Sequence, residues 1–247
     1  MGFAVQFFFC VIPCVSVVEA NRHFPLRVKA VTIDLDGTLV DSVPDLAVAT
    51  NLMLRELKRD ALAESAVRMF VGKGIPRLVE RALAGAVDGS VEKSVLASAL
   101  PIFERCYLAV NGKHTTIFSG VREGLDTLRE MHLPLACVTN KAAQFTLPLL
   151  EQLGIAHYFA QVISGDTLPQ KKPHPAPLLH ACRQFGIAPS EMLVVGDSMN
   201  DAEAARAAGC PVFCVTYGYN EGRDVRALDV DAIVPTLIDA TRLIRKI

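Results

Sequence analysis

The chain has 247 residues, and its 25 Lys and Arg against 26 Asp and Glu give a formal net charge of −1 with histidine neutral. This balance argues against a nucleic-acid binder, which would carry a basic excess or stripe. With 51% hydrophobic and 21% charged residues the chain is not a disordered one, and no apolar run reaches the roughly 18 residues that a membrane span needs. The composition favours a soluble globular α/β protein without stable membrane insertion.

The N-terminal segment is uncharged and mostly apolar from Met1 to Val18. A secretory signal has a basic residue before its apolar stretch, whereas the first basic residue here is Arg22. We therefore expect residues 1–26 to be a poorly ordered extension. A working signal or anchor and a packed structural role are the alternatives.

The seven cysteines indicate a reducing compartment. Their number is odd, and no CxxC pair or zinc-type spacing of Cys and His occurs. Cys137 and Cys214 lie inside apolar runs typical of strands, where a small buried thiol is the ordinary role. A cytoplasmic location is the prediction.

From Arg27 onward, short apolar runs alternate with stretches of helical periodicity. Several runs are continuously apolar, as expected of parallel strands that are covered on both faces. The alternation implies right-handed βαβ units and a doubly wound, Rossmann-like parallel sheet. Predicted strands are residues 29–35, 135–139, 161–164, 192–196, 211–216 and 232–234, and the helices include 121–131 and 200–208.

One interval breaks the alternation. Between about residues 43 and 116 only helical patterns occur, at 45–59, 63–70, 75–86 and 91–110. That length suffices for a small helical cap domain inserted after the first strand, with Gly112 and the pair Ser119 and Gly120 as candidate hinges on the return. The predicted division is an extension at 1–26, an α/β catalytic core at 27–42 and 117–247, and a cap at 43–116.

Four polar segments follow, or lie near, the C-terminal ends of predicted strands. In an open parallel sheet these ends form the binding crevice. The segments are DLDGTLVD at 34–41, TNK at 139–141, KKP at 171–173 and GDSMND at 196–201.

These residue types suit phosphoryl transfer. Asp34 and Asp36 can reach one centre only if the chain turns after the strand, which Gly37 permits. With Asp197 they offer the hard oxygen ligands that Mg²⁺ prefers, with room for waters and a phosphate oxygen. The metal and Lys172 would neutralise a phosphate dianion that three carboxylates would repel. Neutralisation and positioning are the main tasks in this class of reaction.

The four segments resemble, in order and spacing, the motifs of the haloacid dehalogenase superfamily, from about residue 29 to the C-terminus. The helical insertion is similar to the cap of one of its subgroups. Within that subgroup, the sequence most resembles bacterial enzymes that hydrolyse 2-phosphoglycolate. The segments that carry this resemblance are DLDGTLVDSVPDL at 34–46, VGKG at 71–74, KKPHPAPLL at 171–179 and above all TYGYNEGR at 216–223.

The resemblance implies a role for each of five residues. Asp34 would be the nucleophile that forms an aspartyl-phosphate. Asp36 would protonate the leaving alkoxide and then activate water. Thr139 and the Asn140 amide would hold the phosphoryl group, and Lys172 would pair with Asp34 and the phosphate.

A magnesium ion is the cofactor that the resemblance implies. Its predicted ligands are Asp34, Asp36 through the backbone carbonyl, and Asp197, with Asp201 supporting the site. The implied partner is a small phosphate ester, hydrolysed to glycolate and phosphate if it is 2-phosphoglycolate, by a monomer or homodimer. The substrate could instead be another small phosphorylated metabolite, or the enzyme a capped sugar phosphomutase.

Cap residues are the least determined part of the predicted site. Lys73, between Gly72 and Gly74, would reach a substrate carboxylate when the cap closes, or would be an exposed charge. Arg77 and Arg81, on a predicted helix, are interpreted as exposed charges, with the same contact to substrate as the alternative. Lys171 is interpreted as a solvated neighbour of Lys172, and His174 as part of a local turn.

Two further functions fit less well. A carbon–halogen hydrolase of the same superfamily needs neither a metal nor an acid two residues after the nucleophile, so Asp36 and Asp197 speak against it. A signalling receiver domain also uses Asp, Thr and Lys on a parallel sheet, but its phosphorylated Asp follows a middle strand in a much shorter chain.

Overall fold

The computed structural model describes residues 24–247. The predictions for Met1 to Val18, and nearly all of the predicted extension at 1–26, lie outside the described residues. Within the described chain no helix combines the length and the apolar character that crossing a membrane requires.

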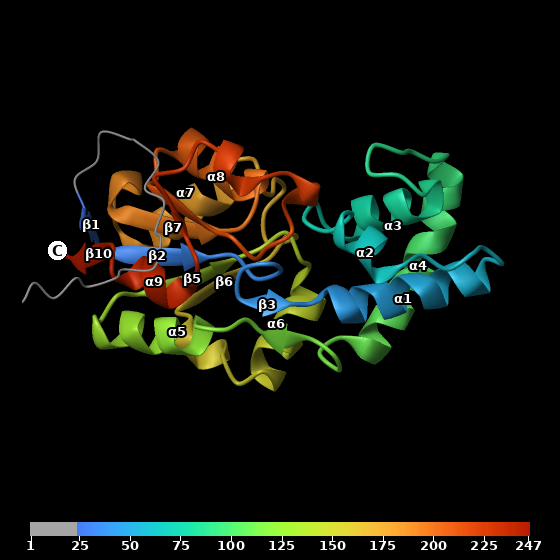
Figure 1. Ribbon diagram of the computed structural model, residues 1–247, viewed down its shortest axis with the longest axis horizontal. Helices are drawn as coiled ribbons and strands as arrows, with labels where there is room; N and C mark the ends of the chain where they lie inside the picture. Colours follow the sequence, from blue (N-terminus) through green and yellow to red (C-terminus); the bar gives the residue numbers. More distant parts are fainter. Residues whose placement is uncertain (1–23) are drawn as a thin grey trace, which may run out of the picture.

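A six-stranded parallel sheet forms the centre of the larger part of the molecule (Figure 1). Its order is β6-β5-β2-β7-β8-β9, and every neighbouring pair is parallel. The predicted strands are all present, and their ends agree to within two residues. Their bounds are β2 Ala30–Ile33, β5 Leu135–Val138, β6 Gln161–Ile163, β7 Met192–Gly196, β8 Val212–Val215 and β9 Ala232–Val234.

Helices cover both faces of this sheet, so the predicted doubly wound α/β fold is confirmed (Figure 1). Successive residues of a strand point to opposite faces, and in β5 Cys137 packs in one core and Ala136 in the other. Cys137 and Cys214 are buried, as predicted. One face carries α5 Val121–Glu130, α6 Ala143–Gln152 and α9 Leu237–Thr241, and the other carries α7 Ala176–Phe185 and α8 Met199–Ala208.

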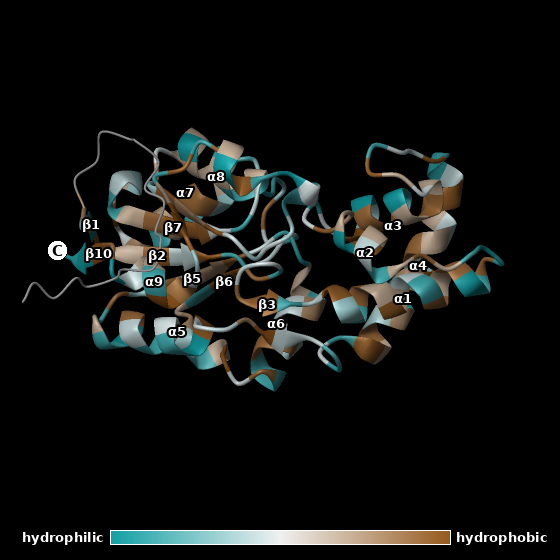
Figure 2. Cartoon of the chain, viewed as in Figure 1, coloured by the Kyte–Doolittle hydropathy of each residue, from teal (hydrophilic) through white to brown (hydrophobic). Residues whose placement is uncertain are grey.

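The first four of the helices between β2 and β5 form the predicted insertion at the C-terminal end of the sheet (Figure 1). They have a hydrophobic core of their own, in which Met53, Leu78 and Phe103 are buried. Apolar residues face this core and polar residues face outward (Figure 2). The helices are α1 Val43–Glu56, α2 Glu64–Arg68, α3 Ile75–Ala84 and α4 Lys93–Val110. They lie within the interval assigned to a cap, whose exact boundaries stay a prediction.

One buried carboxylate ties the two chain segments that connect the insertion to the sheet. Asp45, in the first turn of α1, accepts hydrogen bonds from the backbone N–H groups of Gly112, His114 and Thr115 at 2.8–3.0 Å. It also accepts one from the Thr115 hydroxyl at 2.6 Å. A short antiparallel pair, β3 Val40–Asp41 and β4 Thr116–Ile117, joins the same two segments.

Several short elements are absent from the sequence-based assignment. The strand expected at 29–35 is preceded by β1 Leu26–Val28, which pairs with β10 Ile244–Lys246 outside the main sheet. Two or three residues are too few to establish a period, and such strands form only through their partners. In the described chain, 3₁₀ turns lie at Ala156–Tyr158, Pro189–Glu191, Asn220–Gly222 and Val225–Ala227.

Candidate active site

Asp34 is the first residue after β2, in the middle of the sheet. The chain turns at Gly37, which has φ +91°, a value that L side chains rarely adopt. A Cβ added to Gly37 would lie only 2.3 Å from Oδ2 of Asp197. Only glycine therefore allows this loop to turn and to pass directly against Asp197.

One oxygen of Asp34 is held and the other is left available. Oδ1 accepts a hydrogen bond from the backbone N–H of Leu35 at 2.7 Å and contacts Nζ of Lys172 at 2.9 Å. No donor to Oδ2 is found among residues 24–247. The carboxylate is thus oriented through one oxygen while its other oxygen is available to a ligand.

Lys172 lies between two carboxylates and is nearly inaccessible to solvent. Its Nζ is 2.9 Å from Asp34 and 2.6 Å from Asp201, and its side chain is 3% exposed. Burial alone would lower the pKa of Lys172, but the charges of Asp201 and Asp34 outweigh burial and raise it. The ammonium group is therefore a fixed positive charge beside Asp34.

Three of the predicted metal ligands gather in one place. Asp34, Asp197 and Asp201 each offer a carboxylate oxygen within 4.8 Å of the others. Burial raises the pKa of Asp34 from 3.8 to about 7, against the opposing effect of Lys172. Burial and the charges of Asp201 and Asp34 raise the pKa of Asp197 well above its ordinary value. The cluster has an excess of negative charge that a divalent cation would relieve, and its all-oxygen donors suit Mg²⁺.

Asp197 and Asp201 differ in how far the protein already satisfies them. Asp197 accepts from the backbone N–H of Tyr219 at 2.7 Å and from the Thr38 hydroxyl at 3.1 Å. Oδ1 of Asp201 contacts Lys172, and its Oδ2 accepts from the N–H and hydroxyl groups of Ser198 and the N–H of Asp197. Asp201 is the more fully engaged of the two, which fits the supporting role predicted for it.

The carboxylate of Asp36 points away from this cluster. It accepts from the Ser42 hydroxyl at 2.6 Å and contacts Nζ of Lys141 at 3.0 Å. Its side chain is not part of the three-carboxylate group. The predicted metal contact of Asp36 is through its backbone carbonyl and stays a prediction.

Lys141 is the site residue to which the sequence assigned no role. It follows Thr139 and Asn140 in the second segment, and its side chain is 3% exposed. Its Nζ contacts both Asp36 and the hydroxyl of Tyr107, a residue of cap helix α4. Its place directly after the polar end of a predicted strand could have indicated a site position for Lys141. Its partner on the cap, Tyr107, is 34 residues away in sequence and belongs to no motif.

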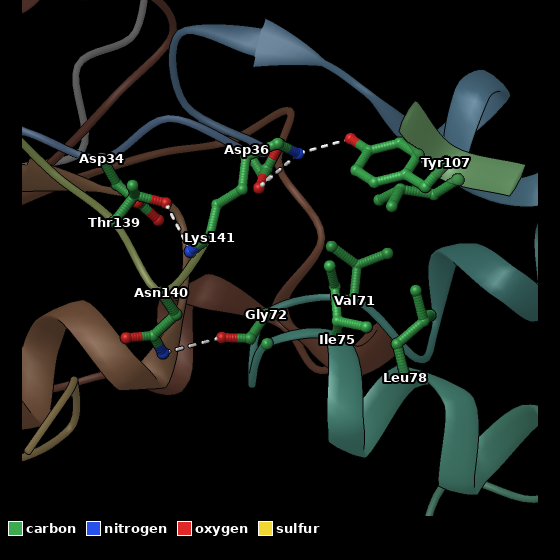
Figure 3. Close-up of a pocket in the computed structure, with 12 residues that line it drawn as sticks. Asp34, Asp36, Val71, Gly72, Ile75, Leu78, Tyr107, Thr139, Asn140 and Lys141 are labelled. Atoms are coloured by element: carbon green, nitrogen blue, oxygen red, sulfur yellow. Dashed lines mark hydrogen bonds and ion pairs between the residues drawn. The ribbon is translucent and has the colours of Figure 1, made fainter. Parts of the chain in front are cut away.

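Thr139 and Asn140 stand at the end of β5, next to Asp34 (Figure 3). The Thr139 oxygen accepts from the N–H of Lys141 at 3.2 Å, and its hydroxyl hydrogen remains available. The side-chain amide of Asn140 donates to the carbonyls of Gly72 and Lys172, both at 2.9 Å. No acceptor is found for the Asn140 backbone N–H within the described chain. This N–H is the amide that could bind a phosphate oxygen.

The cap closes over the site through the loop before α3 (Figure 3). The carbonyl of Gly72 accepts from Asn140 and, at 3.3 Å, from Asn200. Lys73 lies 3.3 Å from Glu221 and is 36% exposed. The structure places it at the cap–core boundary, and its contact with a substrate stays a prediction.

Arg81 was predicted to be an exposed charge, and this prediction is wrong. Its side chain is 1% exposed and lies 2.7 Å from Glu221. Amphipathic spacing cannot reveal such a pair, because Glu221 is 140 residues away. Arg77 is also half-buried and bonds within the cap to Glu80 and to two carbonyls.

The two uncertain neighbours of Lys172 have ordinary surroundings. Lys171 is half-buried, and burial lowers its pKa. His174 accepts a hydrogen bond from the N–H of Ala176 at 3.1 Å, which confirms its role in a local turn.

Comparison with known proteins gives one consistent result. The family profile of haloacid dehalogenase-like hydrolases matches residues 28–209. A phosphoglycolate phosphatase of Nitrosospira multiformis is 57% identical over 224 residues, covering 91% of this chain and 99% of the relative. That of Thiobacillus denitrificans is 50% identical over 225 residues, covering 91% and 99%.

Solved structures agree with this relationship. The crystal structure of a predicted phosphoglycolate phosphatase from Haemophilus somnus superposes with a TM-score of 0.82 at 34% identity, covering 87% of this chain and 97% of that one. The profile, the identities over nearly full lengths and the gathered motif residues point the same way. This chain belongs to the haloacid dehalogenase-like hydrolases.

Proposed function

We propose that this protein hydrolyses 2-phosphoglycolate to glycolate and phosphate, with Mg²⁺ as cofactor and a phosphorylated Asp34 as intermediate. The observation that carries the reaction class is the Asp34 carboxylate, held through one oxygen by Lys172 and free at the other. The names of relatives that are 50% and 57% identical over nearly their whole lengths support the substrate.

In the first half-reaction Asp34 attacks phosphorus as the bond between phosphorus and the glycolate oxygen breaks. Asp36 gives the departing oxygen its proton. Lys172, Thr139 and the backbone N–H of Asn140 bind the oxygens of the phosphoryl group and stabilise the charge that spreads over them.

In the second half-reaction a water molecule attacks phosphorus. Asp36, now ionised, takes the proton of that water, and the bond between phosphorus and Asp34 breaks. The Asp36 carboxylate is oriented for both steps by Ser42 and Lys141. Phosphate leaves, and Asp34 and Asp36 return to their starting states.

The carboxylates of Asp34 and Asp197 would hold the magnesium ion, together with the backbone carbonyl of Asp36, and Asp201 would support them. When bound, the ion would neutralise charge on the phosphate and on the nucleophile. Asp201 and Ser198 restrict the position of the loop that carries Asp197.

The remaining proposals concern the cellular location, the partner and the oligomeric state. Five cysteines of the described chain are free thiols, and four of these are buried, which supports a reducing, cytoplasmic location. The partner is a small phosphate ester, and the protein would act as a monomer or homodimer.

Phosphate release on a substrate panel tests the proposal. The panel holds 2-phosphoglycolate, sugar phosphates, nucleoside monophosphates, phosphoserine and pyrophosphate, each with Mg²⁺ and with excess chelator. We expect a clear preference for 2-phosphoglycolate that disappears with chelator. Release from a different ester would retain the mechanism and change the substrate, and no release by a folded protein would contradict the catalytic assignment.

A further inference from the structure

A cavity separates the catalytic loop of the core from the cap, and its two sides differ in chemistry (Figure 3). On the core side it reaches Asp34 and Asp36. On the cap side its wall is apolar, made by Val71, Ile75 and Leu78. Lys141 is the one cationic residue among those that line it. A ligand that extends from Asp34 towards the cap therefore meets a single positive charge in an apolar surrounding.

The donors of Lys141 and Tyr107 are not all firmly used inside the protein. The ammonium group of Lys141 has three N–H donors, which contact the two Asp36 oxygens at 3.0 and 3.3 Å and the Tyr107 oxygen. The 3.3 Å contact is the longest of the three, so its donor can turn to a ligand. Because the Tyr107 oxygen accepts from Lys141, its own hydrogen needs another acceptor. No acceptor for this hydrogen is found among residues 24–247. Tyr107 is fully buried, so an unsatisfied hydroxyl here favours a ligand that accepts a hydrogen bond.

We propose that Lys141 and Tyr107 bind the carboxylate of the leaving group, and so select phosphate monoesters of short 2-hydroxy carboxylic acids. This inference rests on the proposed function and names the residues that read its substrate. The weakly used donor of Lys141 and the hydroxyl hydrogen of Tyr107 match the two oxygens of a carboxylate. The contact adds a charge-assisted interaction next to the reacting centre.

The position of Asp36 limits how far the carboxylate of the leaving group can lie from the oxygen that leaves phosphorus. Asp36 gives its proton to the oxygen that leaves phosphorus, so that oxygen lies beside the Asp36 carboxylate in the reacting complex. In glycolate one methylene group separates this oxygen from the carboxylate. Lys141 touches Asp36 at 3.0 Å, which places its ammonium group within the reach of so short a substrate.

The apolar wall disfavours the competing sugar phosphates. Sugar hydroxyls placed against Val71, Ile75 and Leu78 would lose their bonds to water without gaining a partner. Aromatic packing holds Tyr107 in place, because its ring lies 4.8 Å from that of Phe145. The wall therefore disfavours polyhydroxylated leaving groups, while the carboxylate keeps its two donors.

Lys73 is less suited to the same task. It lies 3.3 Å from Glu221, is 36% exposed, and lines a second hollow that also reaches Asp34 and Asp36 but includes neither Lys141 nor Tyr107. Both lysines are paired with a carboxylate, but solvent screens the charge of Lys73, whereas Lys141 is 3% exposed. Comparison of the two lysines is therefore a direct test.

The test measures kcat/KM for 2-phosphoglycolate and for 2-hydroxyethyl phosphate, which has a hydroxymethyl group in place of the carboxylate. The variants are Lys141→Met, Tyr107→Phe and Lys73→Met, with the exposed Lys113→Met as control. Circular dichroism and Tm establish that each variant is folded. Tyr107→Phe keeps the ring and so provides a variant that folds if Lys141→Met does not.

In the wild type, 2-phosphoglycolate should be the better substrate. Lys141→Met should reduce its preference over 2-hydroxyethyl phosphate by about 100-fold and Tyr107→Phe by about 10-fold, as expected for lost hydrogen bonds to a charged group. Lys73→Met and Lys113→Met should leave the preference unchanged. Equal losses on both substrates would show that Lys141 acts only by orienting Asp36 and would overturn the inference.

Two other outcomes would also overturn it. If Lys73→Met abolishes the preference while Lys141→Met and Tyr107→Phe retain it, the cap lysine reads the carboxylate. If the wild type itself does not prefer 2-phosphoglycolate, both this inference and the proposed substrate fail. The wild-type result alone thus separates failure of the function from failure of the assignment of Lys141 and Tyr107.

Discussion

The guanidinium of Arg81, on cap helix α3, lies 2.7 Å from the carboxylate of Glu221, which belongs to the loop after β8 in the core. Both side chains are nearly inaccessible, at 1% and 8% exposure. Arg81 also donates to the carbonyls of Phe70 and Val87. Burial would raise the pKa of Glu221, but Arg81 and Lys73 outweigh it and hold the pKa below its ordinary value. A buried ion pair thus joins the cap to the core.

Glu221→Gln should destabilise the closed arrangement strongly. Removing one partner of a buried ion pair leaves the other charge uncompensated, which costs about 3–5 kcal/mol. Lys73→Met removes a partly exposed charge from the same carboxylate and should cost about 0–1 kcal/mol. Urea unfolding of both variants measures the difference. Equal, small losses would contradict a structural role for the Arg81–Glu221 pair.

Asp34→Asn should abolish turnover without unfolding the protein. The amide is nearly isosteric with the carboxylate but is not a nucleophile, so kcat should fall by about 10³-fold or more. Loss of a buried charge near Asp197 and Asp201 should also leave stability unchanged or raised. Phosphate release and Tm are the measurements. Substantial activity in the purified variant would exclude the aspartyl-phosphate mechanism.

The two adjacent lysines of the third segment provide a matched pair. Lys172→Met removes the cation that bridges Asp34 and Asp201, so kcat should fall by about 10²–10³-fold and stability by about 3–5 kcal/mol. Lys171→Met removes a half-buried lysine that makes no ion pair in the described chain and should change kcat/KM by less than about threefold. A larger effect at Lys171 than at Lys172 would reverse the assignment.

The main sheet and the cap helices were predictable because each satisfies a local rule. β5 and β7 are continuously apolar because helices cover both faces, and α3 begins directly after Gly74, as its periodicity predicts. The predicted site residues Asp34, Thr139 and Asp197 directly follow such strands. Their position at one edge of the sheet could therefore be predicted from the sequence, and their roles stay a prediction.

What could not be predicted depends on contacts between distant segments. Tyr107 meets Lys141, and Arg81 meets Glu221, only when the cap lies on the core. A helical pattern shows which face of α4 is apolar, but it does not show which polar tip of a buried aromatic residue reaches another domain. The strands β1 and β10 were missed for the same reason, since each forms only against the other.

Removal of the metal should make stability depend on pH through the carboxylate cluster. In the metal-free protein burial raises the pKa of Asp34 from 3.8 to about 7, so between about pH 4 and 7 the folded state binds more protons than the unfolded state. The free energy of unfolding must then fall as pH rises through this window. Asp197, whose pKa is also raised, adds to the same trend.

Thermal unfolding in excess chelator between pH 5 and 8 measures this effect, and we expect Tm to decrease as pH rises. Saturating Mg²⁺ binds the ionised carboxylates and should raise Tm most at the upper end of the range, which flattens or reverses the slope. Asp34→Asn should weaken the slope in chelator, whereas Asp88→Asn, at an exposed position, should leave it unchanged. A Tm that increases with pH in chelator to the same extent in the wild type and in Asp34→Asn would show that the cluster does not hold excess negative charge in the folded protein.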